Sequence, residues 1–222
     1  MGIVNFGVPE KEVSFLKNLM NLSIFVEGGT FKGGTAKLMS QDFNKVYTIE
    51  KSEKMYLVAK ENLTTLTNVV LLKGDTRDHL KDILEENDNL LFWLDAHWCG
   101  YESYGDSDEC PLIEELKNIF SYEKNYVILI DDARLFLSPP PQPHRISQWP
   151  DLKEIMEALP NNWGIIEYED VIYLYPNKIR DDIKNFLQIE VTKKNQQENK
   201  EINKANSTSF LHKIYNKIRP RE

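Results

Sequence analysis

The feature that most constrains the fold is a regular alternation of apolar runs with helix-like stretches over the first 175 residues. Five of the apolar runs are expected to form strands, at residues 24–27, 45–50, 69–75, 90–97 and 126–133. Helices are expected before and between them, at residues 10–21, 34–41, 52–63, 76–86 and 111–120. Strands that alternate with helices are joined by right-handed crossovers, so these strands are expected to be parallel.

The rest of the domain differs in character. Residues 135–150 contain five prolines and are therefore expected to form neither a helix nor a central strand. A short helix is expected at residues 151–158. The runs "WGIIEYE" and "VIYLYP" follow it and predict a hairpin with its turn at Glu169 and Asp170. The expected fold is α/β, with a seven-stranded, mostly parallel sheet, helices on both faces and a hairpin of the last two strands.

Charge divides the chain into two parts. Residues 193–222 hold eight Lys/Arg and three Asp/Glu, so this tail has a net charge of +5. The net charge of the whole chain is −8, so residues 1–192 have a net charge of −13. A body this acidic is a poor general binder of nucleic acid. The tail predicts a polar linker followed by a basic amphipathic helix, which could dock on its own domain, on another subunit in a homodimer, or weakly on a membrane surface. We expect a domain at 1–192 and a separate tail at 193–222.

Acidic residues stand where the expected parallel strands end. They are Glu27, Glu50, Asp75, Asp95 with nearby His97, and the pair Asp131 and Asp132. In open α/β sheets, ligands bind outside the carboxyl ends of the strands. Clustered carboxylates repel one another, so a sheet with a purely structural role has no need of them. This edge is therefore the expected functional site.

The first expected strand leads into the glycine-rich turn "VEGGTFKGG". Its spacing differs from the dinucleotide-binding fingerprint G-x-G-x-x-G. Glu27 at the strand end would repel a pyrophosphate, and it suits a ligand with a positive centre. A tight structural turn is the alternative explanation for these glycines. Glu50 ends the next strand, where a carboxylate can accept hydrogen bonds from ribose hydroxyls, although it could also be a solvated strand end.

Together, "VEGGTFKGG", "YTIEKS", "KGD" and "FWLDAH" resemble class I S-adenosylmethionine-dependent methyltransferases over residues 20–176. The resemblance implies that the glycine turn holds the methionine part of the cofactor near Glu27, that Glu50 binds the ribose, and that Asp75 borders the adenine. The expected cofactor-binding residues are Glu27, Gly28, Gly29, Thr30, Gly33, Glu50, Lys51, Asp75, Thr76 and Asp95. The double glycine departs from the commoner E/D-x-G-x-G-x-G form of the motif.

A second cluster is expected at the ends of the fourth and fifth strands. Three carboxylates, those of Asp95, Asp131 and Asp132, favour a hard divalent cation such as Mg²⁺. The pattern resembles metal-dependent small-molecule and sugar O-methyltransferases, in which the metal orients the acceptor hydroxyl. The expected catalytic residues are His97, as the candidate general base, and Asp95. Alternatively, an aspartate caps the following segment and His97 is a structural residue.

Two segments beside this cluster are expected to bind the acceptor. The loop 98–110 is acidic and aromatic, which suits either a mobile lid or a plain solvated loop, and it offers Trp98 and Tyr101. The proline segment offers Arg134, His144 and Arg145, which could meet an anionic group, although Arg134 could instead pair with Asp132.

The expected function is O-methylation of a small molecule or saccharide in the cytoplasm. The alternatives are an NAD- or nucleotide-sugar-dependent Rossmann enzyme and a non-catalytic ligand-binding domain of the same fold. The NAD-dependent alternative is disfavoured because Glu27 stands where a pyrophosphate would bind.

Overall fold

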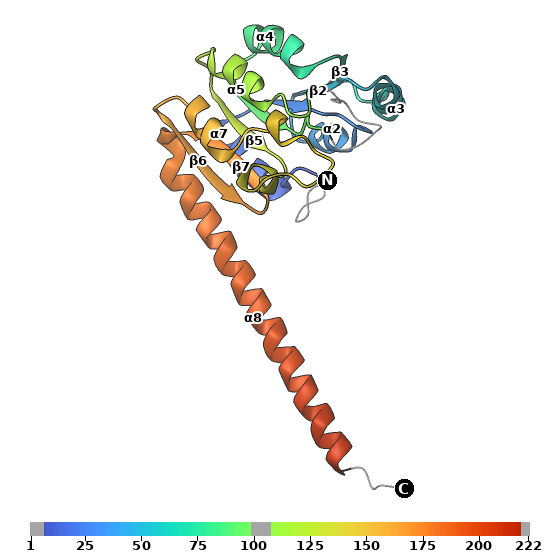
Figure 1. Cartoon of the computed structure of the whole chain (residues 1–222), viewed down its shortest axis with the longest axis vertical. Helices are drawn as coiled ribbons and strands as arrows, with labels where there is room; N and C mark the ends of the chain where they lie inside the picture. Colours follow the sequence, from blue (N-terminus) through green and yellow to red (C-terminus); the bar gives the residue numbers. More distant parts are fainter. Residues whose placement is uncertain (1–6, 99–107, 219–222) are drawn as a thin grey trace. The chain divides into compact units, whose positions relative to one another are not determined.

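The computed structural model describes residues 7–98 and 108–218 of the chain. Its strands form one seven-stranded sheet (Figure 1). The strand order in this sheet is β3-β2-β1-β4-β5-β7-β6. The five strands that are parallel to one another are β1 (Ile24–Gly28), β2 (Lys45–Glu50), β3 (Val69–Lys73), β4 (Leu90–Leu94) and β5 (Tyr126–Ile130). The expected α/β fold with a mostly parallel sheet is confirmed.

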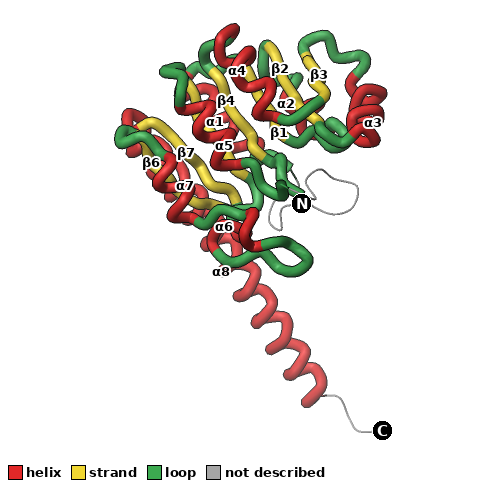
Figure 2. The backbone as a smooth tube through the Cα atoms, turned by 45° about the horizontal axis from the view of Figure 1, so that its top comes forward, coloured by secondary structure: helices red, strands yellow, loops and turns green. Residues whose placement is uncertain are grey.

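Helices cover both faces of the sheet (Figure 2). On one face, apolar residues of α4 (Thr76–Glu86), α5 (Leu112–Phe120) and α7 (Leu152–Ala158) form the core with strand residues such as Val26 and Phe92. The neighbouring strand residue, Phe25, points to the opposite face and packs against Phe43, over which Lys17 of α1 (Glu10–Met20) lies. The sheet is therefore buried on both sides, as its continuous apolar strands indicate.

The remaining helices of the sheet domain begin at polar or flexible residues. Helix α2 (Gly34–Met39) follows the glycine turn, and α3 (Glu53–Leu63) is capped by Ser52, whose hydroxyl accepts the N–H of Met55. Asp75 caps α4, and Asp151 forms a capping box with Glu154 at the start of α7. The caps at Ser52 and Asp75 fix where the chain turns into a helix after β2 and β3, and the capping box fixes the start of α7 after the proline segment.

The last two strands form the hairpin that the sequence predicts. β6 (Trp163–Tyr168) and β7 (Val171–Pro176) are antiparallel, and β7 also pairs antiparallel with β5. The turn residues Glu169 and Asp170 both have positive φ, 54° and 66°, as a two-residue hairpin turn requires. This turn lies at the edge of the sheet that carries the candidate site, because the backbone carbonyl of Asp170 accepts the N–H of Ala133 just beyond β5.

Three expectations about the elements need correction. Three strands are shorter than expected: β3, β4 and β5 end at residues 73, 94 and 130, so Asp75, Asp95 and Asp131 lie just beyond them. The proline segment is not free of helix, since α6 (Arg134–Leu137) fills its start and the 3₁₀ helix η1 (Ile146–Gln148) lies near its end. Helix α6 is allowed because the prolines begin only at Pro139, and η1 lies between Pro143 and Pro150.

The third correction concerns the tail. The described residues from 179 onward form a separate compact unit, and residues 193–209, expected to be a polar linker, lie within the long helix α8 (Arg180–Ile218), which follows the 3₁₀ helix η2 (Asn177–Ile179). The stretch is polar but contains neither Gly nor Pro, so nothing in it interrupts a helix. Among the described residues, no helix is long and apolar enough to cross a membrane.

Candidate functional site

The glycine turn after β1 is packed tightly against the neighbouring strands. Gly29 has φ +93°, and a Cβ added there would lie 2.6 Å from the carbonyl oxygen of Asp95. A Cβ on Gly28 would lie 2.9 Å from Oγ1 of Thr76, and one on Gly33 would meet Leu63. Glycine is therefore required at residues 28, 29 and 33 because the turn closely approaches the backbone just after β4 and side chains of α4 and α3.

Glu27 is buried beside this turn without a basic partner among the contacts that the structure gives it. The hydroxyl of Thr48 donates to its Oε2 at 2.6 Å, and the hydroxyls of Thr48 and Thr30 are also 2.6 Å apart. Burial raises the pKa of Glu27 to about 8, and the nearby Asp95 and Glu50 add to the rise. A cation beside Glu27 would reverse this effect, so the environment favours a positively charged ligand.

Glu50, at the end of β2, is held in place by backbone groups on both sides. Its Oε2 accepts the N–H of Phe31 at 2.8 Å, and its Oε1 accepts the N–H of Ser52 at 2.7 Å. Burial raises the pKa of Glu50, whereas these hydrogen bonds oppose the rise. These backbone contacts fix the orientation of the Glu50 carboxylate at the end of β2, and a carboxylate held in this way can accept hydrogen bonds from hydroxyl groups.

Asp75 and Thr76 lie at the start of α4, next to the end of β3. Asp75 accepts from Lys51 at 2.9 Å, and it pairs with Arg77 at 2.8 Å while also accepting the backbone N–H of Arg77. Thr76 is buried against Gly28. The predicted cofactor residues from Glu27 to Thr76 therefore line one continuous edge, although Asp75 already has two cationic partners.

The second cluster centres on His97, which follows β4. Its Nε2 lies 3.0 Å from Oδ2 of Asp132 and 3.3 Å from Oδ1 of Asp95, while the side chain is only 7% exposed. Burial alone would lower the pKa of His97, but the contact with Asp132 and the charge of Asp95 outweigh it and raise the pKa. His97 is thus paired with carboxylates from two adjacent strand ends.

Asp132 has φ +57°, which turns its side chain toward His97 and Arg134. Its Oδ1 accepts from Arg134 Nη1 at 2.7 Å, and Arg134 also pairs with Asp170 in the hairpin turn. Burial would raise the pKa of Asp132, but the contacts with His97 and Arg134 hold it well below its usual range. Asp132 therefore carries a negative charge beside His97.

The metal site that the sequence predicts is not assembled. Among the side chains that the structure describes, no group of three or more His, Cys, Asp or Glu is arranged to hold a metal ion. Both oxygens of Asp132 face His97 and Arg134, and Oδ1 of Asp131 accepts the N–H of Asp132. Arg134 supplies the positive charge that a cation would bring, so Asp95, Asp131 and Asp132 do not fit a shared metal as they stand.

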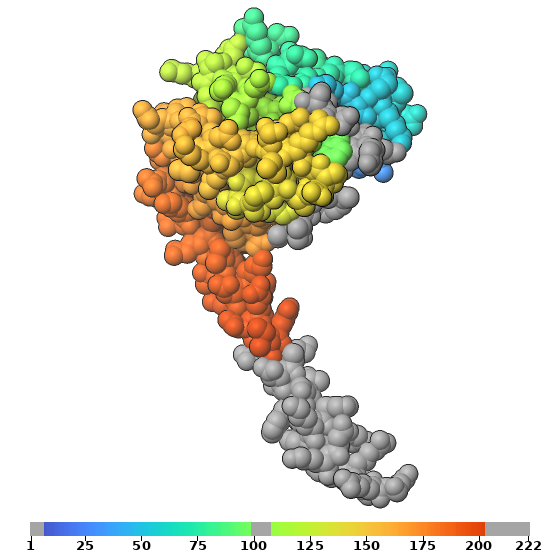
Figure 3. Space-filling model, viewed as in Figure 1, coloured from blue at the N-terminus to red at the C-terminus, as the bar shows by residue number. Residues whose placement is uncertain are grey.

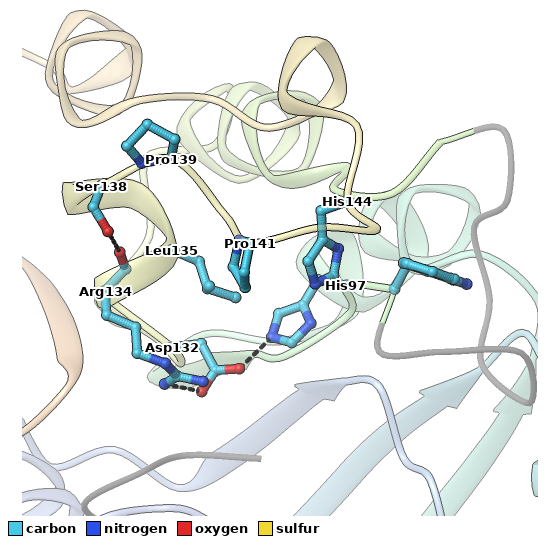
Figure 4. A pocket seen from close by; sticks show the side chains of 9 residues that line it. His97, Asp132, Arg134, Leu135, Ser138, Pro139, Pro141 and His144 are labelled. Atoms are coloured by element: carbon cyan, nitrogen blue, oxygen red, sulfur yellow. Dashed lines mark hydrogen bonds and ion pairs between the residues drawn. The ribbon is translucent and has the colours of Figure 1, made fainter.

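A cavity of about 350 Å³ opens in front of His97 (Figure 4). One wall comes from the strand ends and the other from the proline segment, which lies at the surface of the domain (yellow in Figure 3). The lining residues are His97, Trp98, Asp132, Arg134, Leu135, Ser138, Pro139, Pro141 and His144. The cavity therefore combines apolar walls with several hydrogen-bonding side chains.

Three of the five expected acceptor-binding residues, Trp98, Arg134 and His144, line this cavity together with His97. Arg145 is exposed and is not among the lining residues; its backbone N–H donates to Glu109. Tyr101 lies outside the described residues.

Sequence reasoning missed two carboxylates that organise the site. Asp170 accepts the backbone N–H of Arg134 at 2.9 Å from across the hairpin turn. Glu109 is buried beneath the proline segment and accepts the indole N–H of Trp149 at 2.8 Å. Neither residue ends a strand, so the strand-end rule could not find them. For Asp170, its place in a predicted two-residue turn was the only available signal.

Comparisons with known proteins bear on the fold. No family model matches the chain, and no curated protein matches its sequence. A proposed O-methyltransferase from Klebsiella pneumoniae is similar in structure, with a TM-score of 0.56 and 15% identity over 78% of this chain and 82% of that one. A methyltransferase from Podospora anserina, solved with S-adenosylhomocysteine, gives 0.54 and 17% over 77% and 80%.

A proposed caffeoyl-CoA O-methyltransferase from Staphylococcus aureus gives a TM-score of 0.52 and 15% identity over 77% of this chain and 84% of that one. At these identities the similarity establishes the fold, which is the seven-stranded Rossmann-like sheet of class I methyltransferases.

Proposed function

We propose that this protein is an S-adenosylmethionine-dependent methyltransferase that acts on a hydroxyl group of a small molecule or saccharide. The observation that carries the proposal is the order of groups along one sheet edge. A tight glycine turn and the buried carboxylates of Glu27 and Glu50 lie at β1 and β2, and the cavity with a carboxylate-paired His97 lies at β4 and β5. On this proposal, the cofactor-binding groups and the proton acceptor share one edge of the sheet.

The residues at β1, β2 and β3 suit the parts of this cofactor. Glu27, buried without a basic contact in the structure, would hold the ammonium group of the methionine part. Glu50, fixed by the N–H groups of Phe31 and Ser52, would accept both ribose hydroxyls. Asp75 and Thr76 would border the adenine. When bound, S-adenosylmethionine supplies a methyl group on a positively charged sulfur.

His97 would remove the proton from the acceptor hydroxyl. Asp132 at 3.0 Å and Asp95 at 3.3 Å hold its imidazole and would stabilise the positive charge that it gains with the proton. Arg134, bound to Asp132 and Asp170, keeps Asp132 ionised and in place. In this scheme Asp132 orients the base, which is the role its geometry supports in place of metal binding.

The acceptor is proposed to be a hydroxylated small molecule, with a saccharide as the leading class. Trp98, Leu135 and two prolines offer apolar surface for a ring face. Ser138 and His144 offer hydrogen-bonding groups for hydroxyls. Arg134 is already bound to two carboxylates, which argues against an acceptor selected by its negative charge.

Titration calorimetry with S-adenosylhomocysteine, and with NADH as the comparison, tests the proposed function. We expect micromolar or tighter binding of S-adenosylhomocysteine and none of NADH, because the amino group of the first would pair with Glu27, whereas this buried acid offers a pyrophosphate no favourable charge. Failure of the full chain to bind S-adenosylhomocysteine, or tighter binding of NADH, would overturn the proposal.

A further inference from the structure

Two stretches far apart in the sequence meet beside the cavity around one buried residue, Glu109, which is 3% exposed. The backbone N–H of Glu109 donates to the side chain of Gln148 at 3.0 Å. Its backbone carbonyl accepts the N–H of Trp98 at 2.8 Å. Glu109 therefore joins the chain after β4 to the proline segment.

The side chain of Glu109 is directed at the proline segment. Its carboxylate accepts the indole N–H of Trp149 at 2.8 Å and the backbone N–H of Arg145 at 3.0 and 3.1 Å, and it lies 3.3 Å from Nδ1 of His144. Burial would raise the pKa of Glu109, but these hydrogen bonds outweigh it and lower the pKa below its usual range. The group is therefore an ionised carboxylate at neutral pH.

The contact with this carboxylate bears on which ring nitrogen of His144 carries a proton. An ionised carboxylate has no proton to donate, so the contact with Nδ1 of His144 requires a proton on that nitrogen. In the neutral ring, Nε2 is then the hydrogen-bond acceptor. The ring is also packed against Trp98 and Trp149, with centroid distances of 5.2 and 5.1 Å, and it lines the cavity together with His97 (Figure 4).

We propose that Glu109 is a positioning residue that holds His144 in the Nδ1–H tautomer, so that Nε2 serves the cavity as a hydrogen-bond acceptor. The cavity then contains two histidines, each held by a carboxylate: His97 by Asp132 and His144 by Glu109. The consequence for the acceptor molecule rests on the proposed methyltransferase function. An acceptor nitrogen at His144 selects a molecule with a second hydroxyl beside the one that His97 deprotonates, as in the neighbouring hydroxyls of a saccharide.

Nitrogen-15 NMR of the histidine side chains in the full, ligand-free chain tests this proposal. At a pH where His144 is neutral, the wild-type spectrum should show a protonated Nδ1 and an unprotonated Nε2, with the signals assigned by their loss in His144→Gln. In Glu109→Gln we expect the Nε2–H tautomer to become populated. Glu53→Gln, a matched change at an exposed carboxylate paired with Lys73, should leave the spectrum unchanged.

Two results would overturn the proposal. The first is a wild-type His144 that carries its proton on Nε2, which needs no variant and so does not depend on whether Glu109→Gln folds. The second is a folded Glu109→Gln protein with a lower melting temperature and an unchanged His144 spectrum, since Glu109 would then be structural only. The spectra contain no cofactor, so a failure to bind S-adenosylhomocysteine would overturn the proposed function and leave this result standing.

Discussion

At the scale of single residues, the site contains two kinds of carboxylate: burial raises the pKa of some, and neighbouring hydrogen-bond donors lower the pKa of others. The pKa values of Glu27 and Asp131 are raised, to about 8 and about 7 respectively, because both residues are buried near other acids. Asp132 and Glu109 have lowered pKa values because hydrogen-bond donors surround them. Glu27 is suited to receive a cationic ligand, whereas Asp132 and Glu109 each already contact a histidine.

Replacing Glu27 with Gln should stabilise the ligand-free protein at alkaline pH. An unperturbed glutamate has a pKa of 4.5, whereas burial raises the pKa of Glu27 to about 8 in the folded protein. Protonation of Glu27 therefore makes its whole contribution to the free energy of unfolding below pH 4.5, and this contribution is lost as the pH rises through about 8. Gln removes the buried charge. We expect the free energy of unfolding to rise by about 1–3 kcal/mol near pH 9, and the gain to shrink toward pH 5.

Urea denaturation across this pH range checks the prediction, with the exposed Glu53→Gln as the control. A Glu27→Gln protein less stable than wild type at alkaline pH would show that the Glu27 charge is compensated in the folded state. The same variant should bind S-adenosylhomocysteine more weakly, which links the cost of the buried acid to its function.

Two further single changes separate the cofactor site from the acceptor site. Glu50→Gln should weaken S-adenosylhomocysteine binding at least about tenfold, because one of the two hydroxyl-accepting oxygens becomes a donor. His97→Asn should leave that affinity within about threefold, because His97 lies in the acceptor cavity. Titration calorimetry with S-adenosylhomocysteine on both variants checks this prediction. An equal loss of affinity in the two would contradict the proposed separation of the cofactor site from the acceptor site.

At the scale of elements, periodicity predicted the five parallel strands, the hairpin and its turn residues, because both faces of the sheet are buried and the strands are continuous apolar runs. Strand ends were less predictable. The strand expected at residues 126–133 includes Asp131 and Asp132, yet β5 ends at Ile130. Two residues later, Asp132 has a positive φ and pairs with Arg134. That turn depends on a partner that periodicity cannot show.

The glycine turn offers a matched pair of substitutions. Gly29→Ala should destabilise the fold by about 2–4 kcal/mol, because Gly29 has positive φ and its new Cβ would lie 2.6 Å from the carbonyl oxygen of Asp95. Gly34→Ala should be neutral or stabilise by up to about 1 kcal/mol, since Gly34 is helical and a Cβ there meets nothing within 4 Å. Equal stabilities in urea denaturation would contradict this packing.

At the scale of the whole molecule, the strand-end rule predicted which sheet edge carries the candidate site but not which side chains contact one another there. His97, Asp95 and Asp132 were expected at one sheet edge and are found in contact there. The grouping of Asp95, Asp131 and Asp132 as metal ligands stays a prediction, and Arg134, which lies two residues from Asp132 on α6, competes with a metal for that carboxylate. The contact of Glu109 with His144 joins residues 35 positions apart through an irregular segment, and no sequence pattern marks it.

The basic tail should be separable from the binding site. A chain that ends after Thr192 keeps every cofactor and acceptor residue named here, so we expect its affinity for S-adenosylhomocysteine to stay within about twofold of the full chain. The full chain, in contrast, should self-associate in sedimentation or bind anionic lipid vesicles, and the truncated chain should lose that property. Identical sedimentation and vesicle binding for the two chains would remove the proposed roles of the tail.

The most direct test of the central claim is a crystal structure of the full chain with S-adenosylhomocysteine and Mg²⁺. We predict that the ribose hydroxyls contact Glu50, that the amino group lies beside Glu27, and that the sulfur faces the cavity of His97, with no metal bound by Asp95, Asp131 and Asp132. A ligand bound elsewhere, or a sulfur directed away from that cavity, would contradict the proposed methyl transfer at this edge.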